Sequence, residues 1–248
     1  MNTLEIENVS FTYDNERGKP AHQVLNRISF FASEGESIGL VGANGVGKST
    51  LLKIISGLLP LQDGRVTVVG LPLRKENLKS IRQQMGYVFQ DSESQLFMST
   101  IYEDVAFTPR NYGFTFEEAE RMVMEALRLV GLEDSRDKQV YKLSGGEKKL
   151  ASIATVLAMH SKLMLLDEPT VGLDPRNRRR LIHVINDLTC TKLIASHDLD
   201  FVYDTCQRVI LLSDKGIAAT GNTEEVLRSQ EILERNGLEL PLSFSRAF

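Results

Sequence analysis

The sequence predicts an α/β protein with a parallel sheet in its core, an antiparallel β subdomain at its start and an inserted α-helical subdomain. Three observations support this class. Short segments rich in Val, Ile and Phe fill the first third of the chain, and a helical pattern dominates the middle. Toward the end, continuous apolar runs alternate with helical segments, which is typical of strands in a parallel sheet.

The first third predicts β structure because its apolar segments are bounded by Gly, Asp and Glu, which favour turns and ends. The expected strands are residues 3–13, 28–32, 37–42 and 65–70. The chain near its start is therefore predicted to form a hairpin.

The middle of the chain predicts an amphipathic helix over residues 115–132. Apolar side chains recur there at helical spacing, on one stripe made of Phe116, Ala119, Val123, Ala126, Leu127 and Val130. Thr115 and Glu118 have the spacing of a capping box at the helix start, and Gly131 is suited to end the helix.

The last third predicts buried strands at three continuous apolar runs, residues 163–167, 192–196 and 208–212. Their alternation with helices indicates a parallel sheet. From Gly216 onward we expect one or two short amphipathic helices and then an extended end. We therefore divide the single domain into a core of residues 1–89 and 160–213, a helical subdomain of 90–159 and a helical tail of 214–248.

The composition is that of an ordinary globular protein, with 248 residues, 42% hydrophobic, 25% charged and a net charge of -4. This acidic balance argues against nucleic-acid binding, which usually needs a basic excess. We interpret the basic cluster of Arg176 and residues 178–180 as a solvated helix face. Cys190 and Cys206 lack metal-ligand spacing and fit reduced thiols of a cytosolic protein.

No apolar run approaches the roughly 18 residues that a membrane span needs. The first ten residues also lack the basic start and apolar core of a signal peptide. We therefore expect the chain itself to stay in the cytosol.

The strongest motif is a phosphate loop of the form G-x-x-x-x-G-K-S, set between a strand-like and a helix-like run. Its glycines let backbone N–H groups point at phosphate oxygens, and the following helix adds the positive end of its dipole. Lys48 would neutralise the β and γ phosphates, and the Ser49 hydroxyl would bind Mg²⁺. The predicted nucleotide-binding residues are Gly42, Ala43, Asn44, Gly45, Val46, Gly47, Lys48, Ser49 and Thr50.

The loop makes the core a predicted P-loop NTPase core that binds a nucleoside triphosphate. By itself the loop does not separate a kinase, a GTPase and a transport ATPase.

Two adjacent acids, Asp167 and Glu168, end the first buried run. In a P-loop protein Asp167 is the expected partner of the Mg²⁺ shell. A carboxylate beside the γ-phosphate can orient or deprotonate the attacking water, so Glu168 is the predicted catalytic base.

His197 follows another buried run and should lie on the sheet edge that carries the phosphate loop, where ligands collect. There it could hydrogen-bond the γ-phosphate and the water. Gln90 ends the predicted strand GYVFQ and could reach the Mg²⁺ or the water. We interpret the other histidines as surface or core residues; they are His22, His160 and His183.

The stretch LSGGE, residues 143–147, begins a further predicted helix. Ser144 and Glu147 have the spacing of a capping box. A helix that starts with Gly145 and Gly146 presents bare N–H groups and a positive dipole end to an anion.

In their order along the chain these motifs resemble the nucleotide-binding subunit of ATP-binding-cassette (ABC) transporters. The resemblance covers nearly the whole chain. It runs from Tyr13 through the phosphate loop, Gln90, LSGGE, LLDEP and GLDP to His197.

The resemblance implies the fold of an ABC nucleotide-binding domain and the hydrolysis of ATP with Mg²⁺. It implies that Tyr13 stacks on adenine and that Asp174 links two sites across a dimer interface. In a head-to-tail dimer, residues 144–146 of one chain (Ser144, Gly145, Gly146) would contact the γ-phosphate held by the other. Integral membrane transporter subunits are implied partners, which would place the chain on the cytoplasmic face of a bacterial or archaeal membrane.

Residues 87–114 are similar to the ATPase subunits of energy-coupling-factor transporters, the importers of vitamins and of cobalt or nickel. The chain departs from that pattern at Thr108, where glycine is usual, and at residues 91–94, where a proline-containing turn is common. The short tail that includes residues 236–244 resembles the members that import metals. The resemblance therefore implies import of a cobalt or nickel ion.

Three alternatives remain open at this point. The transporter could import a vitamin, the chain could be a soluble ABC ATPase that acts on DNA or ribosomes, or it could be a P-loop kinase. The soluble relatives generally carry a coiled-coil insertion or two cassettes, and a kinase has no use for LSGGE.

LSGGE and the residues that follow it, the signature of the family, depart from the usual pattern at two positions. Glu147 replaces the usual Gln, and Leu150 replaces a common Arg. A carboxylate near a triphosphate should weaken binding unless it is turned away or neutralised. We expect Glu147 to fold back onto the Ser144 N–H as a cap, with Lys148 and Lys149 nearby to neutralise it.

Overall fold

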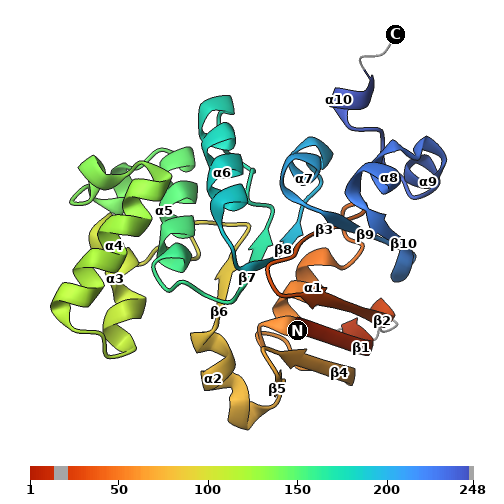
Figure 1. Ribbon diagram of the computed structural model, residues 1–248, viewed down its shortest axis with the longest axis horizontal. Helices are drawn as coiled ribbons and strands as arrows, with labels where there is room; N and C mark the ends of the chain where they lie inside the picture. The colour runs from red at the N-terminus through yellow and green to blue at the C-terminus, as the bar shows by residue number, and fades with distance from the viewer. Residues whose placement is uncertain (14–21, 246–248) are drawn as a thin grey trace. The chain divides into compact units, whose positions relative to one another are not determined.

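A computed structural model describes residues 1–13 and 22–245 of the chain (Figure 1). The chain divides into two compact units. Unit 1 consists of Met1–Arg82 with Thr191–Phe248, and unit 2 consists of Gln83–Cys190. Each unit contains parallel strands and helices, as the predicted α/β class requires.

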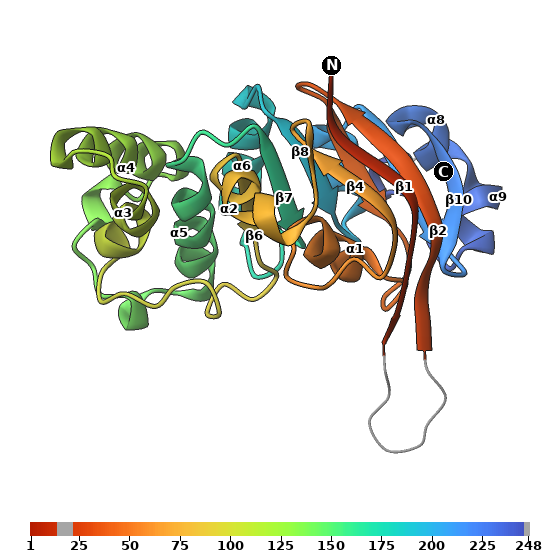
Figure 2. The ribbon, with the colours of Figure 1, turned by 90° about the horizontal axis from the view of Figure 1, so that it is seen from below.

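Unit 1 begins with the predicted hairpin, which belongs to an antiparallel sheet of order β2-β1-β4-β5. Its strands are β1 (Asn2–Tyr13), β2 (His22–Ser33), β4 (Asp63–Val68) and β5 (Leu71–Pro72). Figure 2 shows β1, β2 and β4 side by side. Alternate residues of β1 are buried, and the alternation shifts between Ile6 and Val9, where Asn8 has a φ of 50° and the pairing register slips.

Unit 1 also holds the strand order β10-β9-β3-β8, in which β3 runs parallel to both β8 and β9. These strands are β3 (Ser37–Val41), β8 (Thr191–Ala195), β9 (Arg208–Ser213) and β10 (Gly216–Asn222). All five residues of β3 and of β8 are buried. The predicted parallel core is therefore confirmed.

β10 corrects the prediction that the tail from residue 214 is helical. It pairs antiparallel with β9 through a tight turn at Asp214 and Lys215, whose φ values of 43° and 73° suit a two-residue hairpin loop. Its sequence, GIAATGN, shows little apolar alternation, so the local pattern does not predict a strand. The segment is a strand because it pairs with β9.

The helices of unit 1 are α1 (Lys48–Ile55), α7 (Leu199–Thr205), α8 (Thr223–Arg228), α9 (Gln230–Arg235) and α10 (Leu242–Ser245). The two short tail helices, α8 and α9, are confirmed. The predicted extended end is wrong, because Asp200 of α7 accepts hydrogen bonds from the N–H groups of Leu242 and Ser243 and so caps the start of α10. The tail also contacts α7 through the rings of Phe244 and Tyr203.

Unit 2 contains the parallel pair β6 (Met85–Val88) and β7 (Leu163–Asp167). Its helices are α3 (Ile101–Asn111), α4 (Phe116–Val130), α5 (Gly145–Leu157) and α6 (Pro175–Asp187), and α2 (Leu78–Gln83) leads into it from unit 1. Single 3-10 turns lie at Glu133–Ser135 and Val140–Lys142 in unit 2 and at Lys75–Asn77 in unit 1. α3, α4 and α5 pack against one another (Figures 1 and 2).

α4 confirms the predicted helix and both of its ends. Thr115 and Glu118 form the capping box, and Gly131 ends the helix in the left-handed conformation. The apolar stripe is buried except at Phe116, which is 65% exposed. Phe116 is the first residue of the helix, and the buried position that the stripe misses is Met122.

The described residues contain no helix that is both long and apolar enough to cross a membrane. Cys190 and Cys206 form no disulfide in the described part of the chain, and burial raises the pKa of Cys206 to about 12. The division of the domain at residues 90, 160 and 214 stays a prediction.

Candidate nucleotide-binding site

The phosphate loop joins the end of β3 to the start of α1. Gly42, Gly45 and Gly47 have φ values of 150°, 80° and 111°, which other residues rarely adopt. A Cβ atom on Gly47 would also lie 2.7 Å from a side-chain carbon of Leu25, and one on Gly42 would lie 2.5 Å from Leu212 O. The loop can therefore follow this path only with glycine at these positions.

α1 begins without a side-chain cap. Its N-cap residue is Gly47, and its first turn holds no acid. Backbone N–H groups at a helix start point toward the space in front of the helix, where they and the helix dipole favour an anion.

Lys48 places a positive charge inside the curve of the loop. Its side chain is buried, and its Nζ donates to Gly42 O at 2.7 Å and Ala43 O at 3.2 Å. The remaining predicted contacts of the loop, Asn44, Val46 and Ser49, lie between and beside these residues along the same turn. The arrangement is suited to triphosphate oxygens.

Tyr13 ends β1 and is tied to α1, because its hydroxyl lies 3.2 Å from Thr50 Oγ1. Its ring packs edge-on against Phe11, with 4.9 Å between the ring centroids, and remains partly exposed. An aromatic face is thus held beside the helix that follows the phosphate loop.

His197 follows β8 and is exposed. The Ser196 N–H donates to Leu40 O, so β8 and β3 end next to each other on one sheet edge. The expected position of His197 on the edge that carries the phosphate loop is confirmed. The other histidines, His22, His160 and His183, are exposed surface residues.

In unit 2 the two acids at the end of β7 are both buried, Asp167 to 3% exposure and Glu168 to 5%. The Tyr87 hydroxyl donates to Asp167 Oδ2 at 3.3 Å. Burial first, and then the charge of Asp167, raises the pKa of Tyr87, so Tyr87 stays a neutral donor that orients this carboxylate.

Glu168 has a left-handed backbone, with a φ of 47°. This conformation is uncommon for residues with a side chain and concentrates at functional sites. Glu168 O accepts a hydrogen bond from the Val171 N–H, which closes the turn after β7. The strained turn holds the carboxylate at the strand end, where sequence reasoning placed a catalytic base.

Gln90 lies two residues beyond β6, which ends at Val88 rather than at Gln90 as the segment GYVFQ suggested. Its side chain is exposed. The glutamine therefore sits on a loop, where its amide can reach outward.

Lys149 is the residue of this region whose role sequence reasoning missed. Its side chain is 2% exposed, and its Nζ donates to Phe89 O at 3.0 Å and Gln90 O at 2.7 Å. The pattern offered one signal, since Lys149 is the first residue of a continuous buried run of α5, where a lysine is unusual.

The start of α5 confirms the capping box of Ser144 and Glu147. The Ser144 N–H donates to Glu147 Oε2 at 2.8 Å. The expectation that Lys148 and Lys149 neutralise Glu147 is wrong, because Lys138 does so, with its Nζ 2.8 Å from Glu147 Oε1. The hydrogen bond from Lys138, and then that from the Ser144 backbone, lower the pKa of Glu147.

Asp174 caps the start of α6. Its carboxylate accepts from the Asn177 N–H at 2.8 Å and from Asn177 Nδ2 at 2.9 Å. The carboxylate is exposed, so it is both fixed in place and accessible.

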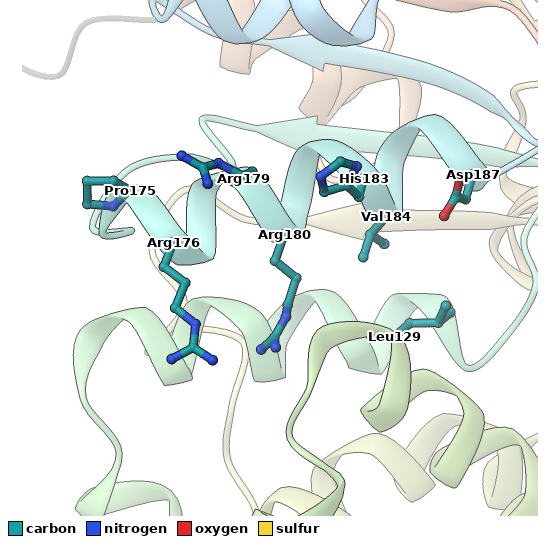
Figure 3. Close-up of a pocket in the computed structure, with 8 residues that line it drawn as sticks. All are labelled: Leu129, Pro175, Arg176, Arg179, Arg180, His183, Val184 and Asp187. Carbon is teal, nitrogen blue, oxygen red and sulfur yellow. The ribbon is translucent and has the colours of Figure 1, made fainter.

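Arg176, Arg179 and Arg180 of the basic cluster line a pocket of about 580 Å³ beside α6 (Figure 3). Arg176 and Arg180 point to the same side of the helix, and Arg180 donates to Val130 O at 3.2 Å. Arg176 and Arg179 are exposed, as the interpretation of a solvated face requires, whereas Arg178 and Arg180 are half-buried.

Taken together, an uncapped glycine loop with an internal lysine and a strand ending in two buried acids define the class of P-loop NTPases. A family model described as ABC transporter matches residues 25–171. The chain belongs to the ABC transporter family and is an ATPase of that family.

Its relatives match along nearly their full length. A putative ABC transporter ATP-binding protein of Gloeobacter violaceus is 45% identical over 245 residues, which is 98% of each chain. The energy-coupling factor transporter ATP-binding protein EcfA of Carboxydothermus hydrogenoformans is 39% identical over 242 residues, covering 96% of this chain and 87% of that protein.

Two solved structures have a closely similar fold. CbiO1 of Clostridium perfringens, part of the ABC transporter complex cbiONQ, has a TM-score of 0.81 and 32% identity over 94% of both chains. An ATP-binding cassette solved as a dimer in a post-hydrolysis state with ADP and Pi has a TM-score of 0.81 and 26% identity. That match covers 89% of this chain and 98% of the other.

Proposed function

We propose that this chain is the ATP-hydrolysing subunit of an energy-coupling-factor importer, and that the importer takes up cobalt or nickel ions. The observation that carries the assignment to an energy-coupling-factor importer is the likeness to EcfA over 96% of this chain, supported by the similarity to CbiO1 over 94% of both chains. The metal substrate rests on the tail that includes residues 236–244, which resembles the members that import metals. The chain would act as a peripheral protein on the cytoplasmic face of the membrane.

ATP binding falls to unit 1 in this proposal. The backbone N–H groups at the start of α1 and the Lys48 ammonium bind the phosphates, and Tyr13 stacks on the adenine. The bond between Tyr13 and Thr50 keeps the ring near the helix that holds the phosphates.

The residues proposed for Mg²⁺ are Ser49, Gln90 and Asp167. A hydroxyl, an amide carbonyl and a carboxylate are the hard oxygen donors that Mg²⁺ prefers, and Tyr87 holds Asp167 in place, so the donor set fits this ion. When bound, Mg²⁺ would neutralise charge on the β and γ phosphates.

Hydrolysis needs a base and groups that stabilise the charge on the transferring phosphoryl group. Glu168 accepts the proton of the attacking water, and its strained turn holds the carboxylate in place for this step. Lys48 and His197 stabilise the developing charge, and Gln90 helps to orient the water.

Two chains pair head to tail in this proposal, so that residues 144–146 of one chain contact the γ-phosphate held by the other. Asp174, fixed at the start of α6, lies in the interface. ATP favours the closed pair, and hydrolysis releases it, which is a population shift between two states.

The membrane subunits need a docking surface on this chain. Phe97, 63% exposed, stacks edge-on with Phe107 at 4.8 Å between ring centroids. Exposed aromatic pairs are typical of protein interfaces, so we assign this pair to the membrane partner.

The first test replaces Glu168 by Gln and measures ATP binding and turnover separately. We expect the affinity for ATP to stay within about threefold and kcat to fall by about a hundredfold or more, since general base catalysis supplies a factor of that size. Full turnover in this variant would exclude Glu168 as the base. Glu125→Gln, an exposed acid of α4, serves as the control.

The transported substrate is tested in vesicles that carry the chain with the membrane subunits that copurify with it. Uptake of radioactive cobalt or nickel that stops in Glu168→Gln would support the metal assignment. A vitamin importer of the energy-coupling-factor class is the second candidate, and uptake of a vitamin without metal uptake would establish it. Failure to copurify with any membrane protein would favour a soluble ABC ATPase.

A further inference from the structure

Lys149, a buried lysine, connects α5, the signature helix that begins in LSGGE, to residues 89–95, the glutamine loop that carries Gln90. Lys149 lies on the second turn of α5 and is among the largest fully buried side chains in the described part of the molecule. Burying a charge is costly unless hydrogen bonds compensate for the lost water. The compensation here comes from two main-chain oxygens, Phe89 O at 3.0 Å and Gln90 O at 2.7 Å.

A second side chain holds the same loop from the other side. Gln95 Oε1 accepts from the Phe89 N–H at 3.1 Å, and Gln95 Nε2 donates to Ser152 O at 2.7 Å and Thr155 Oγ1 at 2.8 Å. Both polar groups of the Phe89 backbone are therefore bonded to α5, its O directly by Lys149 and its N–H through Gln95.

The strand that leads into the loop lies against the same helix. A Cβ atom on Gly86 of β6 would lie 2.0 Å from Val156 Cγ1 of α5, so the two backbones approach as closely as a glycine permits. Helix, strand and loop are thus packed and bonded as one block within unit 2.

The acids of the predicted reaction centre act electrostatically on the Lys149 ammonium. Burial lowers the pKa of Lys149, and the charges of Asp167, Asp91 and Glu168 partly offset this effect. The cation thus interacts with the carboxylates at the end of β7 while it holds the carbonyls of the glutamine loop.

We propose that Lys149 is a positioning residue that joins the signature helix to the glutamine loop, so that residues 144–146 and Gln90 are displaced together. The inference rests on the roles given above to Gln90 and to the start of α5. It follows that when residues 144–146 contact a partner chain, the same displacement moves Gln90 into place.

Lys149→Met tests this directly, because Met has a similar length and keeps the apolar stem of the side chain while it removes the ammonium donors. Lys148→Met is the matched control. It removes the neighbouring lysine of the same helix, whose ion pair with the exposed Glu93 touches the same loop only at the surface. Lys149→Arg restores the charge and its donors.

The first readout is hydrogen exchange of the backbone amides of residues 89–95 in the full chain without nucleotide. We expect exchange there to be about tenfold faster in Lys149→Met, near wild type in Lys148→Met and largely restored in Lys149→Arg. Gln95→Met should loosen the same amides by itself. Unchanged exchange in Lys149→Met, or an equal rise across the whole chain, would overturn the proposal.

The second readout is a double-mutant cycle with Gln90→Ala on ATP turnover. We expect Lys149→Met to lower kcat by about tenfold to a hundredfold with little change in KM, since a small misplacement of a positioned group has that effect. Combined with Gln90→Ala, it should add less than about twofold. Multiplied losses would mean that Lys149 does not act through Gln90. Because the exchange measurement needs no ATP, it separates failure of this inference from failure of the proposed function.

Discussion

The starts of α1 and α5 both contain glycine, but they are capped in opposite ways. The N-cap residue of α1 is Gly47, which makes no side-chain cap, and the first turn of α1 holds no acid. The N-cap residue of α5 is Ser144, which forms a complete capping box with Glu147, and Gly145 and Gly146 are the first residues of that helix. The start of α1 therefore lacks a side-chain cap, whereas the start of α5 is capped by its own side chains.

The difference indicates which of the two helix starts is suited to bind phosphate within a single chain. The start of α1 combines backbone N–H groups without a side-chain cap and the positive charge of Lys48, so it is suited to hold a triphosphate within one chain. At α5, Ser144 and Glu147 bond to each other's backbone N–H groups, and the charge of Glu147 is neutralised by Lys138. In the proposed function this capped end adds its contacts to a site that the phosphate loop of another chain has formed.

The largest effect is expected for Ser144→Arg, which puts a long side chain over the start of α5. If residues 144–146 complete the partner's site, kcat should fall by about a hundredfold, the range seen when one donor to a transition state is lost. Binding of ATP to the monomer should be unchanged, because the loop at α1 is untouched. Steady-state turnover and equilibrium binding check the two halves.

Ser144→Ala is the control for this variant. It removes the cap, which costs about 1 kcal/mol of stability, without adding bulk. A loss of turnover equal to that of Ser144→Arg would point to the capped helix end rather than to the space in front of it. Normal turnover in Ser144→Arg would remove the trans role altogether.

Gly47→Ala tests the N-cap position of α1. The φ of 111° and the contact with Leu25 should cost about 1–3 kcal/mol in the free energy of unfolding. Loss of a hydrogen bond to a charged phosphate costs about 1.5–3 kcal/mol, or roughly tenfold to a hundredfold in Kd. Denaturant unfolding and ATP titration measure these effects.

Gly45→Ala gives the comparison within the same loop. Gly45 has a φ of 80°, but an added Cβ would meet no atom within 4 Å. It should therefore destabilise less than Gly47→Ala. Equal losses would show that backbone conformation alone, and not the contact with Leu25, decides the effect.

Tyr13→Ala should weaken ATP binding by about tenfold, because stacking on a base is worth about 1–3 kcal/mol. Tyr13→Phe keeps the ring and loses only the bond to Thr50, so KM should stay within about threefold. The ratio of KM values for the two variants tests the stacking role. An equal rise in both would assign the effect to the hydroxyl.

The smallest effect is expected for Glu147→Gln. Glutamine can also close a capping box, so only the partly exposed ion pair with Lys138 is lost, at a cost of about 0.5 kcal/mol. The pKa of Glu147 is lowered in the folded state, so this stability is present above the ordinary glutamate pKa of about 4.3 and disappears as the pH falls below it. Urea unfolding at pH 7 and at acidic pH should show the difference shrink.

Much of the fold could be predicted because its signals are local. A few neighbouring residues determine each of these features: the phosphate loop, the apolar runs of β7 and β8, and the caps of α4 and α5. The positions of the candidate site residues follow from the same segments, since strand ends and helix starts fix them. Only their roles need the relatives and the experiments.

The sequence by itself determined the class of the protein, the loop that binds phosphate and the capped start of α5, because contiguous residues encode motifs and helix ends. The tertiary structure decided the rest. β10 exists because β9 offers it a partner, and α10 because Asp200 caps it from α7. Lys149 reaches the carbonyls of the glutamine loop about sixty positions earlier in the chain. Contacts between segments so far apart depend on packing, which no local pattern records.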